Sequence, residues 1–367
     1  MRLARLPILS AIVVVMMCCG CANESDRSAA REWAFELEKV WEIQQIADDE
    51  LLRPAEPRVA DDGTLYYHDF DRHLSYVVDR NGTLVSTFAR RGSDEGDVSF
   101  YINCFPAGDY VVVGAPDKLH FFTRQGQSVK AVPNNLFARF PLAFKNENEF
   151  WVAPGALGDA PDDSAAVIHV NLASGSETIV HRFALTDEEK KPTGGGVVVG
   201  LTPQIKTGFD RHSNRIYFGK NTDTVIYWLA VDDGDRGSFS FSGMRQPVSE
   251  TDKRNHFARF NIPEERITAM IGVLPDRMAC YNRIQVIDGL VYLVSAEGIG
   301  HAQTGQLVNI YSPDGRHLYH GRIEVEEGWR ISNPENIQLA PGSLYAVQEN
   351  DAGDKKIVKY AISLPQP

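Results

Sequence analysis

Short apolar runs separated by polar turns recur along almost the whole chain. Between residues 61 and 96 the runs are Leu65 to His68, Leu74 to Val78 and Leu84 to Phe88, and the last two are joined through Asn81-Gly82. Asn-Gly between alternating apolar residues favours a hairpin, because both central residues of that turn adopt positive φ. The segment therefore predicts a meander of short antiparallel strands.

The same unit occurs six times. The copies begin near residues 59, 102, 143, 206, 283 and 336. Blade repeats of β-propellers are about 40–50 residues long, and the additional length here is loop. Four-stranded units without helical periodicity between them are best closed into a ring. We therefore predict an all-β fold, a six-bladed β-propeller that spans residues 33–364.

The last copy lacks a fourth strand. Its predicted strands lie near residues 336–339, 344–347 and 357–362, and the chain ends soon after. Residues 33–43 alternate apolar and polar side chains, beginning at Trp33, and therefore predict an N-terminal strand that closes the last blade. An amphipathic helix is the alternative, which the Glu, Lys and Leu content permits.

The predicted long loops all fall on one face, where binding residues usually lie, although loops also tolerate insertion at little cost. The longest is the insertion at residues 244–282, between blades four and five. Pro263 before two glutamates predicts the start of a helix that Pro275 ends, and residues 247–257 predict a short helix capped by Ser249. The insertion is either a lid beside the channel or an excursion packed on blade four or five through its apolar residues, which are Phe257, Phe260, Ile262, Ile267, Met270 and Ile271.

The N-terminus is typical of an export signal. Arg2 and Arg5 precede an apolar run from Leu6 to Met17, which is shorter than the ~20 residues that a membrane-spanning helix needs. Gly20-Cys21 resembles the lipobox of bacterial lipoproteins, in which the cysteine is acylated, although Cys18 stands where that motif usually has leucine. The resemblance implies a signal peptide at residues 1–20, lipid attachment at Cys21 and a tether at residues 21–32.

In the lipoproteins that this signal resembles, a residue other than Asp after the cysteine suggests the outer membrane, with the protein on its periplasmic or surface side, if the cell has one. Here that residue is Ala22. A plain signal peptide cut after Ala22 is the alternative. In either case the protein is expected outside the cytoplasm.

Composition narrows the function further. The 367 residues carry a net charge of −12 and are 43% hydrophobic, so a substantial core is available. The acidity and the lack of a basic stripe argue against nucleic acid as a partner. Of five cysteines only Cys104 and Cys280 lie outside the signal region. Since they belong to different predicted blades, we expect two separate buried thiols rather than a disulfide.

The first repeat resembles the six-bladed NHL and TolB-like propellers. The resemblance rests on Tyr66-Tyr67-His68-Asp69, on Asn81-Gly82 and on the glycines at positions 92 and 96, and the repeats extend it over about residues 59–364. It implies a fold, and a fold alone does not give a function.

Four oxygen donors are expected near the channel mouth, at the starts of inner strands: Glu56, Asn103, Asn282 and Glu335. This set of donors is similar to that of six-bladed lactonases and related hydrolases, which hold a calcium-like ion there with carboxylate and Asn oxygens, and such oxygens suit a hard cation. The similarity implies a calcium-dependent hydrolase or lyase. The alternative is that Asn and Glu are simply common at strand starts, and the sequence shows no zinc spacing and no G-x-S-x-G motif.

The loop-rich face offers further candidate ligand donors in Arg72, His73, Arg254 and His256, each of which solvated surface charge explains equally well. The first interpretation is therefore a lipid-anchored, non-enzymatic propeller scaffold that binds an envelope protein or a glycan. The second is the metal-dependent enzyme.

Overall fold

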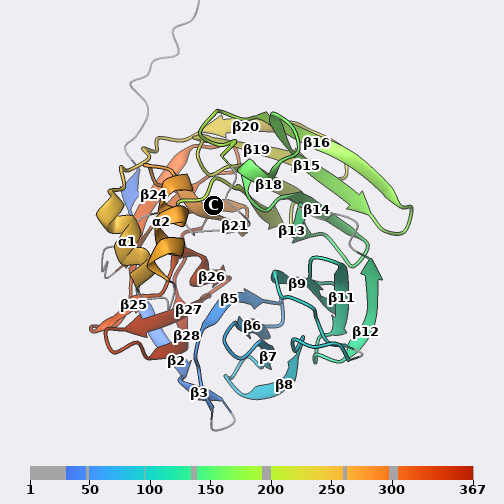
Figure 1. The fold of residues 1–367 in the computed structure, drawn as a ribbon, viewed down its shortest axis with the longest axis vertical. Coiled ribbons are helices and arrows are strands. Elements are labelled where there is room, and N and C mark those ends of the chain that lie inside the picture. The colour runs from blue at the N-terminus through green and yellow to red at the C-terminus, as the bar shows by residue number, and fades with distance from the viewer. Residues whose placement is uncertain are drawn as a thin grey trace, which may run out of the picture.

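The computed structural model describes residues 30–46, 49–94, 96–133, 139–191, 200–258, 263–296 and 305–366. Within these ranges six antiparallel sheets stand as blades around a central channel (Figure 1). The predicted six-bladed β-propeller is confirmed. The export signal, Cys21 and the tether up to residue 29 lie outside the described residues.

The strands of each blade are given from the channel outward. Blade one is β5 (Pro54–Val59), β6 (Leu65–Asp69), β7 (Leu74–Val78) and β8 (Leu84–Phe88), and blade two is β9 (Asn103–Ala107), β10 (Tyr110–Gly114), β11 (Lys118–Thr123) and β12 (Ser128–Pro133). Blade three is β13 (Arg139–Phe144), β14 (Glu149–Pro154), β15 (Ser164–Asn171) and β16 (Ser176–Ala184), and blade four is β17 (Ile205–Asp210), β18 (Arg215–Lys220), β19 (Val225–Ala230) and β20 (Arg236–Ser240). Blade five is β21 (Tyr281–Ile287), β22 (Leu290–Ser295), β23 (Gly305–Tyr311) and β24 (His317–Glu324), and blade six is β26 (Ile337–Ala340), β27 (Ser343–Asn350), β28 (Lys355–Ile362) and β2 (Leu37–Ile43). Four short strands lie outside this scheme: β25 (Trp329–Ile331) pairs with β27, β3 (Gln45–Ile46) pairs with β4 (Asp49–Glu50), and β1 (Arg31–Glu32) pairs with β24.

The core is divided among the interfaces between blades. One buried apolar cluster lies at each of the six interfaces, and a seventh lies in the insertion. Strand β10 shows why. Val111 and Val113 pack toward blade one, whereas Val112 packs toward blade three. Side chains of a strand alternate between its two faces, so a blade inside the ring needs apolar residues on both.

A repeated contact joins neighbouring blades near their outer strands. Gly126 turns with φ of +84°, and a Cβ there would lie 3.0 Å from Phe88 of blade one. Gly82 has φ of +89°, and a Cβ there would lie 3.0 Å from the Trp41 ring. Each turn thus needs glycine for two reasons: glycine adopts the positive φ, and it leaves room for the aromatic side chain of the preceding blade.

The N-terminal strand closes the ring as predicted. β2 pairs antiparallel with β28, and the Trp41 indole donates a hydrogen bond to the Arg80 carbonyl of blade one at 3.0 Å. The strand begins at Leu37, however, and not at Trp33 as the alternation indicated. The reason is that Arg31–Glu32 (β1) pairs in parallel with β24 of blade five, so residues 33–36 cross from blade five to blade six.

The insertion contains the two predicted helices, α1 (Glu250–Ala258) and α2 (Glu264–Val273), which lie over the left side of the ring in Figure 1. Ser249 caps α1, because its Oγ accepts the Asp252 N–H at 3.1 Å. Phe257, Ile267 and Ile271 are buried in the cluster of the insertion, whereas Phe260 and Ile262 lie outside the described residues.

Cys104 and Cys280 are both free thiols. Cys104 is buried, but Cys280 is only partly buried, so the expectation of two buried thiols is wrong for the second. Among the described residues, no helix is long and apolar enough to cross a membrane.

If β2 closes the ring through its packing on blade one, Trp41→Ala should lower the free energy of unfolding by about 2–3 kcal/mol, since a half-buried aromatic ring and its hydrogen bond are lost. Val40→Ala is the matched control, because Val40 lies in the same strand and is 52% exposed. Urea denaturation measures both. Equal losses for the two variants would contradict this account of closure.

Candidate ligand site in the central channel

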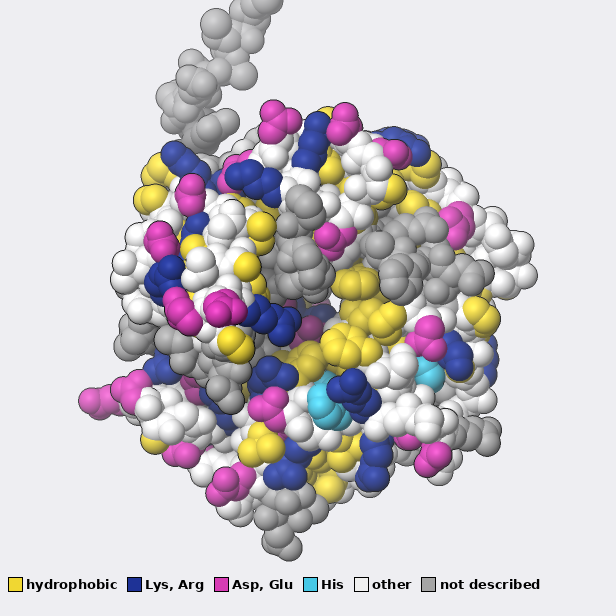
Figure 2. All heavy atoms as spheres, in the orientation of Figure 1, with side chains coloured by type: hydrophobic (Ala, Val, Ile, Leu, Met, Phe, Trp, Pro, Cys, Tyr) yellow, Lys and Arg dark blue, Asp and Glu magenta, His cyan; other side chains and the backbone are white. Residues whose placement is uncertain are grey.

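The inner strands of the blades surround a cavity of about 400 Å³. Small-molecule pockets are typically roughly 300–1,000 Å³. Figure 2 shows the cavity as a hollow in the middle of the face that carries the insertion helices. All six blades contribute lining residues, so one cavity gathers side chains that lie far apart in the sequence.

Bulges in three inner strands shape this cavity. In β5 the two residues Glu56 and Pro57 lie opposite one residue of β6, whereas Leu142 is the additional residue in β13 and Asn282 is the one in β21. A bulge re-aims side chains and is frequent beside functional sites. Glu56, Leu142 and Asn282 all line the cavity.

Glu56 is also held in an unusual backbone conformation. Its φ is +53°, which is uncommon for a residue other than glycine. Its N–H donates to Asn336 Oδ1 at 2.9 Å, which ties blade one to blade six at the bulge. Strained conformations of this kind persist where the surroundings enforce them and often occur at functional sites.

One ion pair crosses the cavity from blade four to blade six. Lys206 Nζ lies 2.5 Å from Glu335 Oε1 and also donates to Gln204 Oε1 at 2.7 Å. Burial opposes ionisation of Glu335, but the Lys206 ammonium group holds the pKa of this carboxyl below its ordinary value. Glu335 is therefore an ionised, neutralised carboxylate.

Arg283 joins blade five to blade six without a carboxylate partner among the described residues. Its Nη1 donates to the Glu335 carbonyl at 2.7 Å and to the Ile337 carbonyl, and its Nη2 donates to Gln338 Oε1. Burial, together with the charge of Arg58, lowers the pKa of Arg283 to about 9. The guanidinium remains charged at neutral pH, and the oxygens that accept its hydrogen bonds are all neutral.

Arg58 is less engaged than Arg283. Its guanidinium lies over the Phe105 ring at 5.1 Å, and its Nε is buried without a hydrogen-bond partner. The described part of the chain offers it no ion pair.

Several other polar atoms that line the cavity are buried and have no partner among the described residues. They are Glu56 Oε2, Asn103 Oδ1 and both amide atoms of Asn282. Asn282 is only 1% exposed. A buried polar group without a hydrogen bond costs about 1–3 kcal/mol, so a cavity that gathers several is suited to a ligand or to water that supplies the partners.

The opposite end of the cavity is bridged by Arg211 of blade four. Its guanidinium reaches Asp61 Oδ2 of blade one at 3.2 Å and the Pro106 carbonyl of blade two at 2.8 Å. These contacts span the ring where the inner hairpins turn.

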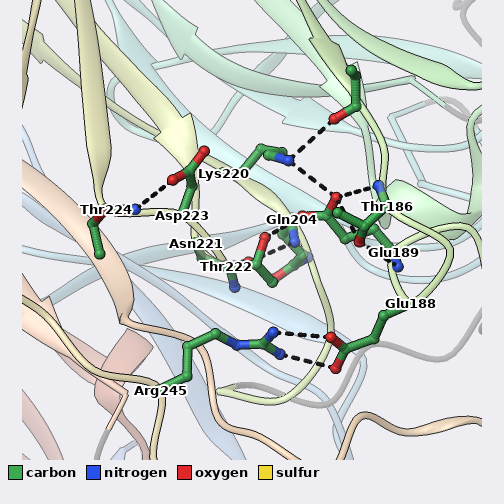
Figure 3. A network of polar contacts seen from close by, with 11 residues as sticks. Thr186, Glu188, Glu189, Gln204, Lys220, Asn221, Thr222, Asp223, Thr224 and Arg245 are labelled. Atoms are coloured by element: carbon green, nitrogen blue, oxygen red, sulfur yellow. Dashed lines mark hydrogen bonds and ion pairs between the residues drawn. The ribbon is translucent and has the colours of Figure 1, made fainter.

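Figure 3 shows a second polar network, which fixes the edge of the loop-rich face rather than the cavity. Lys220 donates to the carboxylate of Glu189 at 3.0 Å, and both side chains are buried. Arg245 makes a bidentate pair with Glu188 at 3.1 and 3.2 Å and donates to the Met278 carbonyl at 3.0 Å. Arg245 thereby holds both ends of the insertion to the loop after blade three.

The structure brings the four predicted oxygen donors to one cavity: Glu56, Asn103, Asn282 and Glu335 all line it. The four candidate donors of the loop-rich face lie elsewhere. Arg72 donates to the Glu50 carbonyl, His73 sits in the turn before β7, Arg254 pairs with Glu250 and Glu264, and His256 packs against Phe257. None of these four lines the cavity.

The donor set does not fit a divalent cation. Four cationic side chains share the cavity with three carboxylates, and two of the carboxylates are already neutralised, Glu335 by Lys206 and Asp61 by Arg211. A calcium site binds its ion through free anionic and neutral oxygens, whereas one carboxylate of this set, that of Glu335, is already paired with Lys206.

Sequence reasoning missed Arg58, Lys206 and Arg283. The available signal was a charged residue inside each of three inner strands, where an apolar residue is expected. Such local violations of the pattern concentrate at functional sites.

Comparisons with known proteins agree on the fold. No protein-family model and no curated protein matches the sequence. A DUF4221 family member from Bacteroides vulgatus is 11% identical with a TM-score of 0.54, and the match covers 91% of this chain and 99% of that one. A Bacteroides fragilis protein named as a candidate exported protein is 11% identical with a TM-score of 0.56 and the same coverage. A gluconolactonase from Xanthomonas campestris is 13% identical with a TM-score of 0.47, covering 91% of this chain and 92% of that one. At this identity the similarity shows the shared six-bladed architecture alone.

Glu56 predicts a pH dependence of stability. Burial raises its pKa to about 7, and the Glu335 charge adds to this, while Arg58, Arg283 and Lys206 act in the opposite direction. Between pH about 4.5 and 7 the folded protein therefore keeps a proton that the unfolded chain has released, and stability falls as the pH rises. Glu56→Gln should remove up to about 3 kcal/mol of this loss, as measured by thermal unfolding across that range.

Glu335→Gln is the matched comparison, and its effect should have the opposite sign. The lowered pKa of Glu335 stabilises the protein above the ordinary pKa of glutamate, so the variant should be less stable than the wild type at pH 7 and converge with it in acid. If Glu56→Gln leaves the pH profile unchanged, Glu56 is not the buried acid described here.

Proposed function

We propose that this protein is an exported, lipid-anchored propeller whose central channel binds a small ligand. The observation that carries the proposal is the partly enclosed cavity in which buried polar atoms from blades one, two and five have no partners. A well-formed cavity with a few convergent polar groups is the usual form of a small-molecule site. The role is that of a binding scaffold, in agreement with the resemblance of the first repeat to NHL and TolB-like propellers.

A small ligand fits the geometry better than an envelope protein or a glycan on the rim. The unpartnered atoms lie inside the ring, where a macromolecule would have to insert a side chain or a terminal group to reach them. A calcium-dependent hydrolase or lyase is less well supported, because the cavity carries more cationic than anionic side chains.

The lipid anchor rests on Gly20-Cys21 and the short apolar run before it. One structurally similar protein from Bacteroides fragilis is named as a candidate exported protein, which agrees with export. Two or three acyl chains hold a protein stably at a membrane, so Cys21 would keep the propeller at the surface of a bilayer.

Asn282→Leu tests the channel proposal. If Asn282 is reserved for a ligand, the leucine should stabilise the free protein by about 1–3 kcal/mol, because two unpartnered buried atoms disappear. Asn336→Leu is the matched control: Asn336 is 2% exposed, but it accepts from Glu56 N–H and donates to Ser332 Oγ. This second variant should be destabilised. Thermal unfolding of both variants without ligand measures the difference.

A loss of stability in Asn282→Leu as large as that in Asn336→Leu would show that Asn282 is a structural residue. The channel proposal would then lose its main support.

The anchor predicts that Cys21→Ser releases the protein from membranes. The wild type, expressed in a bacterium that processes lipoproteins, should sediment with membranes and carry an acylated N-terminal cysteine by mass spectrometry. The variant should remain soluble or keep its signal peptide. Soluble wild-type protein that begins after Ala22 would overturn the anchor and favour a plain signal peptide.

A further inference from the structure

The charges in the cavity do not balance. The cavity is lined by three carboxylates and four cationic side chains: Glu56, Asp61 and Glu335, and Arg58, Lys206, Arg211 and Arg283. Lys206 and Glu335 neutralise each other in a 2.5 Å ion pair, and Arg211 and Asp61 do so at 3.2 Å. Arg58 and Arg283 then remain against Glu56 alone.

The two arginines are used differently. The Nη atoms of Arg283 donate to two backbone carbonyls and to Gln338, so this side chain joins blades five and six. Arg58 donates no side-chain hydrogen bond to the described residues, and its guanidinium lies over the Phe105 ring at 5.1 Å. A guanidinium that is oriented but not paired is well suited to an oxyanion, which it binds with two parallel hydrogen bonds.

Apart from Asn103, the cavity wall contributed by blades two and three is mostly apolar. It includes Ile102, Phe105, Phe140 and Leu142. Figure 2 shows an apolar side and a charged side of the hollow, with hydrophobic side chains on the right and charged side chains towards the left. A ligand that fills the cavity would therefore meet cationic groups at one end and an apolar surface at the other.

We propose that the channel ligand is a small organic anion whose acidic group binds Arg58 and whose apolar body packs against blades two and three. The buried amide of Asn282 has no partner of its own and supplies a further donor to the anion. Arg283 and Lys206 make the electrostatic potential around the site more positive without contacting the ligand directly. This inference rests on the proposed ligand-binding channel and names the chemical class of its ligand.

Three probes separate the two features. Phenylacetate carries both the charge and the apolar body, phenylacetamide carries the body without the charge, and acetate carries the charge alone. Isothermal titration calorimetry at pH 7 and constant ionic strength measures the dissociation constant of each. Phenylacetate should bind about tenfold or more tightly than either of the other two.

Arg58→Met tests the residue, since it keeps an unbranched apolar stem over Phe105 and removes the charge. It should weaken phenylacetate binding about tenfold or more and leave phenylacetamide unchanged. Arg80→Met is the control, because Arg80 is exposed at a turn outside the cavity and its replacement changes net charge equally. Circular dichroism checks that both variants fold.

Each outcome decides a different point. Equal binding of phenylacetate to the wild type and to Arg58→Met, or the absence of phenylacetate binding, would overturn the anion proposal. Binding of phenylacetamide alone would also overturn it, but would leave a ligand-binding channel in place. If Asn282→Leu proves destabilising as well, the channel function itself fails.

Discussion

Burial of both faces of every blade is the constraint on which the rest of the structure depends. Each interface between neighbours contains its own apolar cluster, so no blade has a complete core until both of its neighbours are present. The chain must therefore close into a ring, and it does so by using its N-terminal strand β2 as the outer strand of blade six. Trp41 in β2 packs against Gly82 in the same way as Phe88 packs against Gly126. The blade that closes the ring therefore contacts its neighbour as the other blades do.

Closure also determines where the chemistry lies. The inner strands meet around the axis, and small irregularities at their starts turn side chains into the cavity. Bulges at Glu56, Leu142 and Asn282 interrupt the ladders where an uninterrupted pattern would be more stable. The rigid ring tolerates this cost because the clusters between the blades hold the strands in place. Strain at Glu56 and unpartnered atoms at Asn282 are costs that a bound ligand can offset.

The fold was predictable because it follows from period-two alternation and turn chemistry. Asn81-Gly82 and the flanking strands were placed to within about one residue, whereas the first helix of the insertion begins three residues later than the predicted range 247–257. The start of the closing strand was not, because Trp33 and Phe35 continue the alternation although the chain there crosses between two blades. The gathering of Glu56, Asn103, Asn282 and Glu335 followed from blade geometry alone. The charge balance around these four residues could not be predicted from the sequence, because bulges and ion pairs across the channel, such as that of Lys206 with Glu335, depend on tertiary structure.

The central claim is that the channel attracts an anion at Arg58 rather than a cation at the carboxylates. The most direct test is a crystal soaked in sodium bromide, with diffraction data collected at the bromine absorption edge, beside a second crystal soaked in calcium chloride. The account predicts an anomalous bromide peak in the channel next to the Arg58 guanidinium, and no calcium among Glu56, Asn103 and Asn282. Bromide at surface sites only, or calcium bound by those oxygens, would contradict it.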